Sequence, residues 1–276
     1  MKIKLSLLIP LGLGLAVTAT QGHAADLPQA YQSPRIITSE PPVDYLWNGF
    51  YVGANLGLGW ENGNTHATAV ETKGFPLSIS SPSVNAPAKG ALGGAQIGYN
   101  YRIGNMFVLG TEADFDWSGM SSKWSDVWAA AIPGFPGASL SLQNSGETKM
   151  NWFSTVRGRV GVLASPIFML YGTGGLAIAD VSSSYGTGVF LGSTCLVDCG
   201  GSTVSGVRYG WTAGVGMEYA INNHWSVKGE WLHYDLGKVS GSYHTSGIPF
   251  APVYNVNWST KVDGEIARFG FNYKLP

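Results

Sequence analysis

Acidic and basic side chains recur at every second position in several segments of this chain. Glu112 is followed by Asp114, Arg157 by Arg159, and Lys228 by Glu230, in each case with one residue between them. In a β-strand, residues two apart point to the same face, so each segment would gather its charges on one face. Carboxylates that face guanidinium and ammonium groups can form ion pairs, or they can line a path for ions. Both chemistries need several strands that share one interior.

We expect a set of charged side chains of both signs on this interior face. Its members are Arg102, Glu112, Asp114, Asp116, Arg157, Arg159, Arg208, Glu218, Lys228, Glu230 and Arg268. An unpaired buried charge is costly, so acids and bases in a narrow lumen must meet as ion pairs or hydrogen-bonded networks. We therefore predict one lumen charge network, formed by Glu112, Asp114, Arg157, Arg159, Arg208, Glu218, Lys228, Glu230 and Arg268. The alternative is a selective ion path lined by the same residues.

Two cysteines, Cys195 and Cys199, lie in a stretch rich in glycine and serine and are the only cysteines of the chain. In an oxidising compartment, two cysteines this close predict a local disulfide. Closing so small a ring stabilises by about 2 kcal/mol in the chain-entropy model, so it would shape a loop. A metal site would need further ligands nearby, and the sequence offers none.

Other residue types with catalytic or binding potential form no complete motif. His66 and His244 lie in predicted loops and His233 lies near the same rim, so they could approach one another, and with Tyr243 they could ligate a haem. A GxGxxA match at 172–177 is not followed by the helical period that a dinucleotide site requires. We predict no catalytic, cofactor or metal residues and no enzymatic activity, with an outer-membrane enzyme as the remote alternative.

Eight segments with a period of two would carry the interior charges. They run approximately 48–60, 90–102, 106–118, 149–163, 167–179, 207–220, 224–236 and 263–275. Their other face is apolar: in the first it consists of Val52, Ala54, Leu56, Leu58 and Trp60. Each segment can cross a bilayer as a tilted strand, which takes roughly 9–11 residues. Tyrosine and tryptophan lie mostly near segment ends, as in the aromatic girdles of membrane barrels.

The connections alternate strictly between long and short. Long ones occupy roughly 61–89, 119–148, 180–206 and 237–262 and are rich in Ser, Gly, Pro and Asn, so we expect structureless loops. Short ones fall at 103–105, 164–166 and 221–223. This pattern predicts an all-β fold: an eight-stranded antiparallel transmembrane β-barrel with short periplasmic turns and four long extracellular loops.

Composition and targeting agree with this fold. Hydrophobic residues make up 45% of the chain and charged residues 12%, against about 25% charged in soluble domains. No segment after the leader has eighteen uninterrupted apolar residues, which excludes helical membrane spans. Residues 1–24 resemble a cleaved secretory signal, 25–46 a Pro-rich periplasmic linker, and 47–276 would form the barrel. Loss of Lys2 and Lys4 leaves 14 of the 16 basic residues against 17 acidic ones, a net charge of −3, which gives no reason to expect nucleic acid.

Several motifs resemble a known family. They are WNGFYVGANLGLGW (47–60), VRGRVG (156–161), YGTGGLA (171–177), GWTAGVGMEYA (210–220), WSVKGEWLHYDLG (225–237) and the closing FGFNYKLP. Together they are similar to the small outer-membrane immunogenic proteins of alphaproteobacteria, and the similarity covers nearly all of 47–276. The resemblance implies an OmpA-like eight-stranded barrel in the outer membrane with antigenic surface loops. Some members are described as porin-like or hemin-binding.

The sequence therefore predicts a monomeric outer-membrane protein with a structural envelope role. Its expected partners are outer-membrane lipid and lipopolysaccharide, and the barrel-assembly machinery during biogenesis. A host or haem ligand at the loops remains open, as does the alternative of a small porin or surface haem-binding protein.

Overall fold

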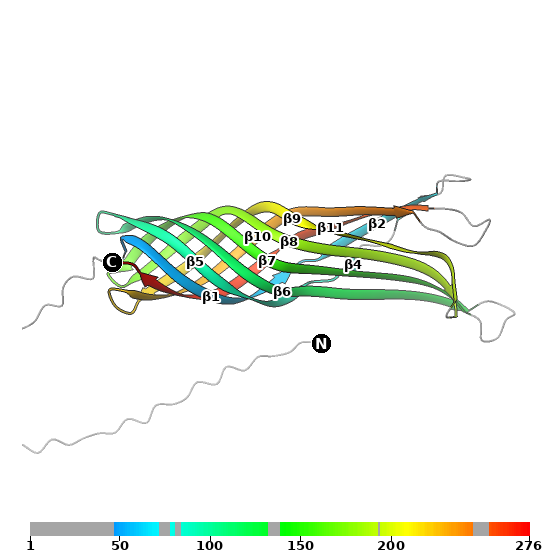
Figure 1. The fold of residues 1–276 in the computed structure, drawn as a ribbon, viewed down its shortest axis with the longest axis horizontal. Coiled ribbons are helices and arrows are strands. Elements are labelled where there is room, and N and C mark those ends of the chain that lie inside the picture. The colour runs from blue at the N-terminus through cyan, green and yellow to red at the C-terminus, as the bar shows by residue number, and fades with distance from the viewer. Residues whose placement is uncertain (1–46, 72–77, 81–83, 132–138, 193, 245–253) are drawn as a thin grey trace, which may run out of the picture. The chain divides into compact units, whose positions relative to one another are not determined.

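Eight strands of the computed structural model pair in a closed antiparallel ring (Figure 1). The structure describes residues 47–276 except 72–77, 81–83, 132–138, 193 and 245–253. Each strand of the ring pairs with the next, and β1 pairs with β11 to close it. The ring consists of β1 (Gly49–Glu61), β5 (Lys89–Ile103), β6 (Phe107–Ala131), β7 (Ser139–Ser165), β8 (Phe168–Leu191), β9 (Thr194–Ala220), β10 (Trp225–His244) and β11 (Tyr254–Lys274). The predicted eight-stranded antiparallel barrel is confirmed.

Three shorter strands follow β1 before the ring resumes at β5. They are β2 (Asn64–Glu71), β3 (Ser78–Ser80) and β4 (Val84–Asn85). Among the described residues there is no helix with the length and apolar character that a membrane crossing requires. The predicted signal and linker, 1–46, lie outside the described residues.

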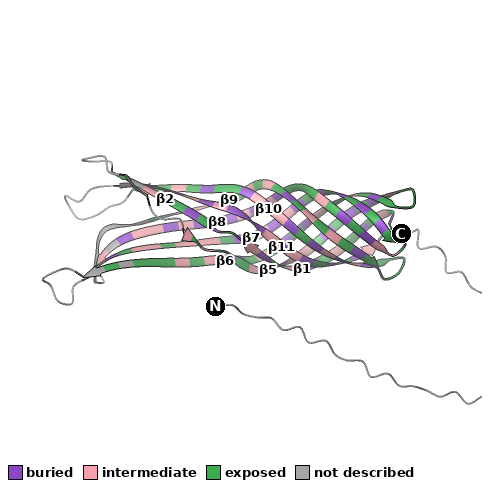
Figure 2. Cartoon of the chain, turned by 180° about the vertical axis from the view of Figure 1, so that it is seen from behind, coloured by how far each residue is buried: buried purple, intermediate pink, exposed green. Residues whose placement is uncertain are grey.

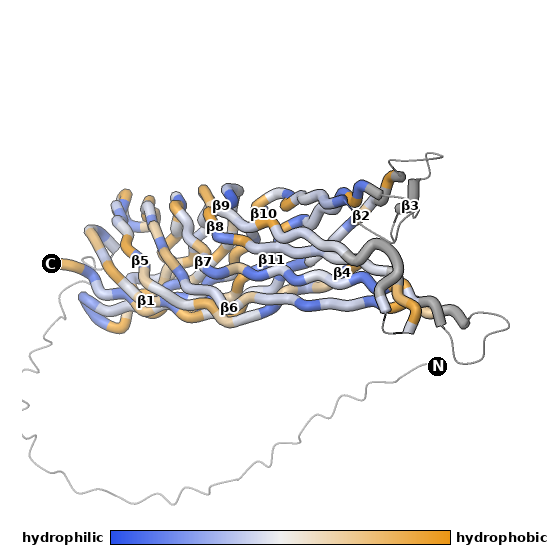
Figure 3. The backbone as a smooth tube through the Cα atoms, turned by 45° about the vertical axis from the view of Figure 1, so that its right-hand side comes forward, coloured by the Kyte–Doolittle hydropathy of each residue, from blue (hydrophilic) through white to orange (hydrophobic). Residues whose placement is uncertain are grey.

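Buried and exposed side chains alternate along the strands of the ring (Figure 2). The exposed set is apolar: on β1, Leu56 and Leu58 expose 69% and 62% of their surface, and on β9 Val215 exposes 65%. Apolar and polar positions also alternate in the hydropathy colouring (Figure 3). The apolar face thus points out of the ring, toward lipid, as the period of two predicts.

Outward-facing tryptophans mark where the lipid-facing wall ends on its extracellular side. We call Trp60, Trp117, Trp152, Trp211 and Trp231 the outer girdle. Trp60 and Trp231 meet edge to face at 5.1 Å, and Phe115 stacks on Trp152 at 5.6 Å. Amphipathic rings favour the membrane–water interface, so the membrane-spanning part of β1 ends at Trp60.

The prediction of four long structureless loops is wrong for most of their length. Strands continue through 119–131, 139–148, 180–191, 194–206, 238–244 and 254–262, and β2 occupies 64–71. The composition of these segments suggested loops because their outer face is rich in serine and glycine and is exposed to water. Their inner face carries buried apolar side chains such as Val181, Val239 and Val256, with buried Ser183 and Thr260 between them. Burial of this inner face stabilises strand pairing beyond the membrane.

Beyond the outer girdle the ring separates into two facing sheets. In the described residues, pairing of β9 with β10 stops at Trp211 and Asp235, and pairing of β5 with β6 stops at Lys89 and Ser121. One sheet then consists of β6 to β9 and the other of β10, β11 and β2 with β3 and β4, as Figure 1 shows. We call the point where β9 and β10 part the fork.

An apolar core lies between these two sheets. The Tyr185 and Trp258 rings stack at 6.3 Å, and the Trp258 indole donates to the Ser202 hydroxyl oxygen at 3.1 Å. Tyr185, Val239, Val256 and Trp258 belong to one buried cluster that continues down to the outer girdle. The extracellular part is therefore a packed sandwich.

Candidate functional site

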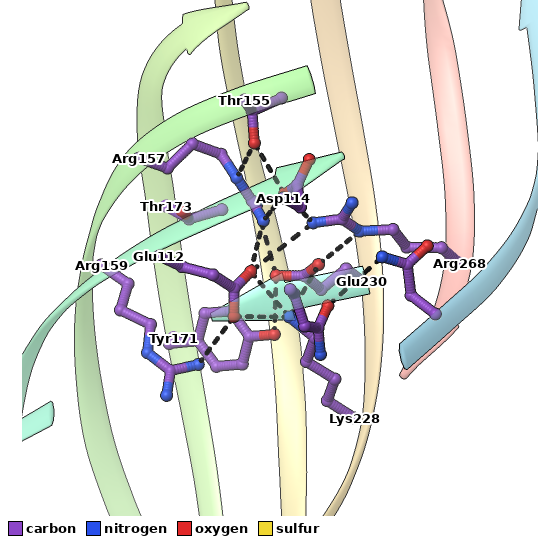
Figure 4. A network of polar contacts seen from close by, with 12 residues as sticks. Glu112, Asp114, Thr155, Arg157, Arg159, Tyr171, Thr173, Lys228, Glu230 and Arg268 are labelled. Atoms are coloured by element: carbon purple, nitrogen blue, oxygen red, sulfur yellow. Dashed lines mark hydrogen bonds and ion pairs between the residues drawn. The ribbon is translucent and has the colours of Figure 1, made fainter. Parts of the chain in front are cut away.

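Charged side chains from five strands converge in the middle of the ring (Figure 4). We call this group the lumen network. It consists of Glu112, Asp114 and Asp116 of β6, Arg157 and Arg159 of β7, Glu218 of β9, Lys228 and Glu230 of β10, and Arg268 of β11. All of these residues are buried. Each strand points them inward because they alternate with lipid-facing apolar residues.

Arg157 is the most heavily bonded cation of the lumen network. Its Nη2 donates to Glu112 and, at 2.9 Å, to Asp114, while Nη1 lies 3.3 Å from Glu230. Its Nε donates to the Thr155 hydroxyl at 2.8 Å, and that hydroxyl donates to Asp114 at 2.7 Å. The planar guanidinium can satisfy three acids at once because its donors spread as a fork.

Lys228 and Arg268 link the remaining central acids. Lys228 Nζ lies 2.7 Å from both carboxylate oxygens of Glu112 and 3.4 Å from Glu230. Arg268 donates to Glu230 at 2.7 Å, to Asp114 at 2.8 Å and to Asp116 at 3.1 Å. Every acid of this centre therefore meets at least one cation.

Arg159 occupies a separate position nearer the short turns. Its guanidinium carbon lies 4.8 Å from the ring centre of Tyr51 and 5.3 Å from that of Tyr171. It also donates to Asn100 at 2.9 Å and to Glu218 at 3.1 Å. Two cation–π contacts and a charged hydrogen bond hold it there.

Interior glycines make room for these two tyrosines. A Cβ at Gly98 would lie 2.2 Å from the Tyr51 hydroxyl, and a Cβ at Gly216 would lie 2.4 Å from the Tyr171 ring. Tyr51 then donates to Glu112 at 2.7 Å and Tyr171 to Glu230 at 2.9 Å. The aromatic rings thus fill the bore and complete the hydrogen bonding of the acids.

The electrostatics of the lumen network favour a fixed arrangement. It holds five acids and four cations, and both signs lie in a water-poor interior where an unpaired charge is strongly disfavoured. Ion pairs gain strength in a low dielectric, but they offset a large desolvation cost, so the network gives specificity more than net stability.

Apolar layers cover the lumen network at both ends. On the short-turn side, Trp47, Val108, Leu163 and Met169 form a buried plug. The Trp47 indole donates at 2.7 Å to the carbonyl oxygen of Pro166 in a short turn. On the other side, Leu92, Met120, Phe153, Leu232 and Ile266 belong to the core that continues between the two sheets. The sequence did not predict these apolar layers.

Two predicted interior cations lie outside the lumen network. Arg208 pairs across the sheet with Ala179, near the fork, and makes no ion pair in the described residues. Arg102 donates to the carbonyls of Gly104 and Asn105 in a short turn. The alternation of residue types predicted correctly that both side chains face the interior. It did not give their position along the barrel axis, and both lie beyond the reach of the central acids.

The other candidate residues do not form a site. His233 is on the outward face, and its Nδ1 forms a 2.9 Å hydrogen bond with Glu265 Oε1. His66 is the strand partner of Ser259 of β11, and His244 is the strand partner of Asn255. Those two positions are four residues apart, about 13 Å along the strand. In the part of the chain that the structure describes, no three His, Cys, Asp or Glu side chains gather as metal ligands.

The segment 172–177 lies within β8. The side chains of Cys195 and Cys199 lie outside the described residues, so the disulfide stays a prediction.

Sequence reasoning missed the uncharged members of the interior. Tyr51 has the same parity as the buried Asn55, and Tyr171 has the same parity as the buried Met169 and Ala177, so the alternation of residues along each strand could have assigned both rings to the interior. Trp47 precedes its strand, and no periodic signal points to its role.

Comparison with known proteins gives consistent matches. A family model described as an outer membrane protein beta-barrel domain matches residues 15–274. The chain is 36% identical over 261 residues to the 31 kDa outer-membrane immunogenic protein of Brucella melitensis biotype 1, covering 94% of this chain and 96% of that one. It is 30% identical over 213 residues to the 22 kDa outer membrane protein of Rhizobium leguminosarum bv. viciae, covering 76% and 74%.

Solved structures include the outer membrane protein OprG from Pseudomonas aeruginosa, at 11% identity and a TM-score of 0.43, covering 84% of this chain and 98% of that one. The family model covers most of the chain, including the whole ring, and the two relatives are also outer-membrane proteins by name. The chain therefore belongs to the outer membrane protein β-barrel domain family and is a protein of the outer membrane.

Proposed function

We propose that this protein is a closed structural barrel of the outer membrane that presents its extracellular sandwich as a surface antigen. The observation that carries the proposal is the filled interior, in which the lumen network lies between two apolar layers. An eight-stranded barrel is just wide enough for its own side chains. Ions would have to cross both apolar layers and break the ion pairs between them.

The apolar plug on the periplasmic side supports closure independently of the charges. Trp47 and Met169 are 1% and 0% exposed, so water does not reach this layer from the short turns. A dewetted constriction blocks ions even where charged groups lie behind it. We infer that the charges of the lumen fix how the strands are arranged around it and do not conduct ions.

The extracellular sandwich supports the antigenic part of the proposal. It is ordered by strand pairing and by a core, so its outer faces present fixed polar surfaces rather than variable coils. Relatives named outer-membrane immunogenic proteins cover nearly the whole chain. We propose no enzymatic activity, and we propose that the protein acts as a monomer embedded in outer-membrane lipid.

Single-channel recording in planar bilayers tests the proposal. The purified full chain, verified as a monomer, should give no stable conductance, with at most rare and small steps. The Arg157→Ser, Arg159→Ser double variant should show more frequent openings, because the central acids lose their cations. Lys123→Ser is the matched control, since Lys123 is 74% exposed in the extracellular part. Stable, large, ion-selective channels from the parent protein would replace this proposal with a porin function.

A further inference from the structure

Glu265 of β11 is a carboxylate on the lipid-facing side of the barrel. Phe269, four residues away on the same strand, exposes 59% of its surface to the outside, so Glu265 shares its outward face. In the strand register, Glu265 lies between Trp60 of β1 and His233 of β10. Trp60 belongs to the outer girdle, so this carboxylate lies at the depth of the lipid headgroups. A partly buried carboxylate is stabilised when a cation lies near it.

Aromatic side chains fix the position of the Glu265 carboxylate. The Trp231 indole donates to its Oε2 at 2.8 Å, and His233 Nδ1 lies 2.9 Å from its Oε1. In the described part of the chain, Glu265 forms an ion pair with His233 and with no lysine or arginine. Lys261, a cation on the same face, lies 3.2 Å from Asp235 instead. The Glu265 side chain is 28% exposed, so a cation from outside the chain can approach it.

Two tryptophans of the outer girdle flank this carboxylate. Trp60 and Trp231 meet edge to face at 5.1 Å, and the hydrogen bond from Trp231 holds its ring beside Glu265. The faces of tryptophan rings attract ammonium groups, and a carboxylate adds a full negative charge. An acid between two tryptophans is therefore suited to an ammonium group, whereas a phosphate group would be repelled by it.

An apolar groove opens in the lipid-facing wall on the membrane side of Trp231. Its volume is about 1100 Å³, and Trp231, Met217 and Phe269 are among the residues that line it. Gly229 lies between Met217 and Phe269 in the strand register. A Cβ added at Gly229 would meet nothing within 4 Å, so the glycine leaves a gap between two exposed large side chains. Because Trp231 borders both the groove and Glu265, one amphiphile can occupy both.

We propose that this surface binds a lipid whose headgroup carries an ammonium group. The ammonium group donates to Glu265 and lies against the rings of Trp60 and Trp231, and one acyl chain fills the groove over Gly229. The occupant is a lipid because the carboxylate and the groove adjoin on the face that meets the bilayer. The site rests on the outer-membrane location of the barrel and is independent of the closure of its lumen.

Native mass spectrometry of the full chain in detergent tests this site. The probes are phosphatidylethanolamine and its N-acetylated derivative with the same acyl chains, which lacks the ammonium charge. The parent protein should bind phosphatidylethanolamine at least about tenfold more tightly, as expected for one charged hydrogen-bonded contact. Glu265→Gln keeps an acceptor for Trp231 and His233 but removes the charge, so it should lose this preference. Asp180→Asn should keep it, because Asp180 is an acid of β8 that shares the outward face with the exposed Val207 and lies outside the groove.

A second pair of variants tests the groove. Gly229→Leu should fill it and weaken the binding of both lipids, whereas Gly158→Leu, at an exposed glycine of β7 outside the groove, should not. If Gly229→Leu does not migrate as a folded barrel in unheated gels, Gly229→Ala replaces it, with a partial loss expected. Equal binding of the two lipids by the parent, or an unchanged preference in Glu265→Gln, would overturn the proposal. Displacement of the lipid by millimolar phosphorylethanolamine would also overturn it, because the acyl chain would then contribute nothing.

Discussion

The indole nitrogen of Trp47 lies 2.7 Å from the carbonyl oxygen of Pro166, across 119 positions of the sequence. This hydrogen bond joins the residue just before β1 to the short turn between β7 and β8. It fixes a ring that is 1% exposed over the periplasmic end of the lumen. The start of the barrel is thus tied to its opposite side.

Replacing Trp47 with Ala should destabilise the barrel by about 3–5 kcal/mol, because a large buried ring leaves a cavity. Trp47→Phe keeps most of the volume and loses only the hydrogen bond, so it should cost about 1 kcal/mol. Heat modifiability in gels or urea titration in detergent measures both. Trp117→Phe is the control, since Trp117 is 69% exposed on the lipid face. Equal stability of Trp47→Ala and the parent would show that the plug is dispensable.

Removing Arg157 should cost about 3–5 kcal/mol of stability, because Glu112, Asp114 and Glu230 would lose a shared cation in a buried site. We expect Arg157→Ser to unfold at clearly lower urea concentration than the parent. Lys123→Ser removes an exposed cation that pairs with Glu147, and it should change stability by less than about 1 kcal/mol. If Arg157→Ser, Arg159→Ser is as stable as the parent and remains closed, the ion pairs do not hold the interior.

Gly216→Ala should destabilise the barrel by roughly 1–3 kcal/mol, because the added methyl group would collide with the Tyr171 ring. Gly172 offers a matched control on the neighbouring strand, where an added Cβ meets nothing within 4 Å. Gly172→Ala should be neutral or slightly stabilising. Similar melting curves for the two variants would contradict the tight packing around Arg159.

A pH dependence is expected from Glu61, which lies just beyond Trp60 on the extracellular side. Burial, and then the charge of Asp263, raises the pKa of Glu61 from 4.5 to about 8. Between these values the folded state binds a proton that the unfolded chain has released. Stability should therefore fall as pH rises from about 4.5 to 8, by up to about 1.4 kcal/mol per pH unit, and level off above.

Glu61→Gln should remove this slope, since the amide stays neutral at every pH. Thermal unfolding of the parent and the variant at pH 5, 7 and 9 measures the difference, which should be largest at pH 9. Asp126→Asn, an exposed acid of β6, serves as the control. Parallel pH profiles of the parent and Glu61→Gln would mean that this carboxyl ionises normally.

Labelling of intact cells with an impermeant maleimide should follow the topology of the ring. Cysteine at Ser125 or Ser145, both on the outer face of the extracellular part, should react. Cysteine at Asn105 or Asn223, in short turns, should react only after the outer membrane is opened. The parent protein gives the background from Cys195 and Cys199, which should be unreactive before reduction if they form a disulfide. Labelling at Asn105 in intact cells would reverse the orientation.

Alternation of residue types was enough to predict the ring, its strand number and its two faces, because each face meets a different solvent. It also identified nearly all of the lumen network, since inward charges on a narrow barrel must find one another. It failed for Arg208 because a period of two gives the face of a residue and not its height. It failed for 119–148 because these strands face water on one side and are rich in small polar residues. In composition such strands resemble loops.

The continuation of the strands beyond the outer girdle has a consequence for what the cell exterior encounters. From Trp117 to the end of β6 at Ala131 there are fourteen residue steps, a path of about 45 Å for an extended strand. A strand of this length carries the paired ends of β6 and β7 well beyond the outer girdle. If this part is the surface antigen that we propose, its epitopes depend on paired strands from distant parts of the sequence, and fragments of the chain should reproduce them poorly.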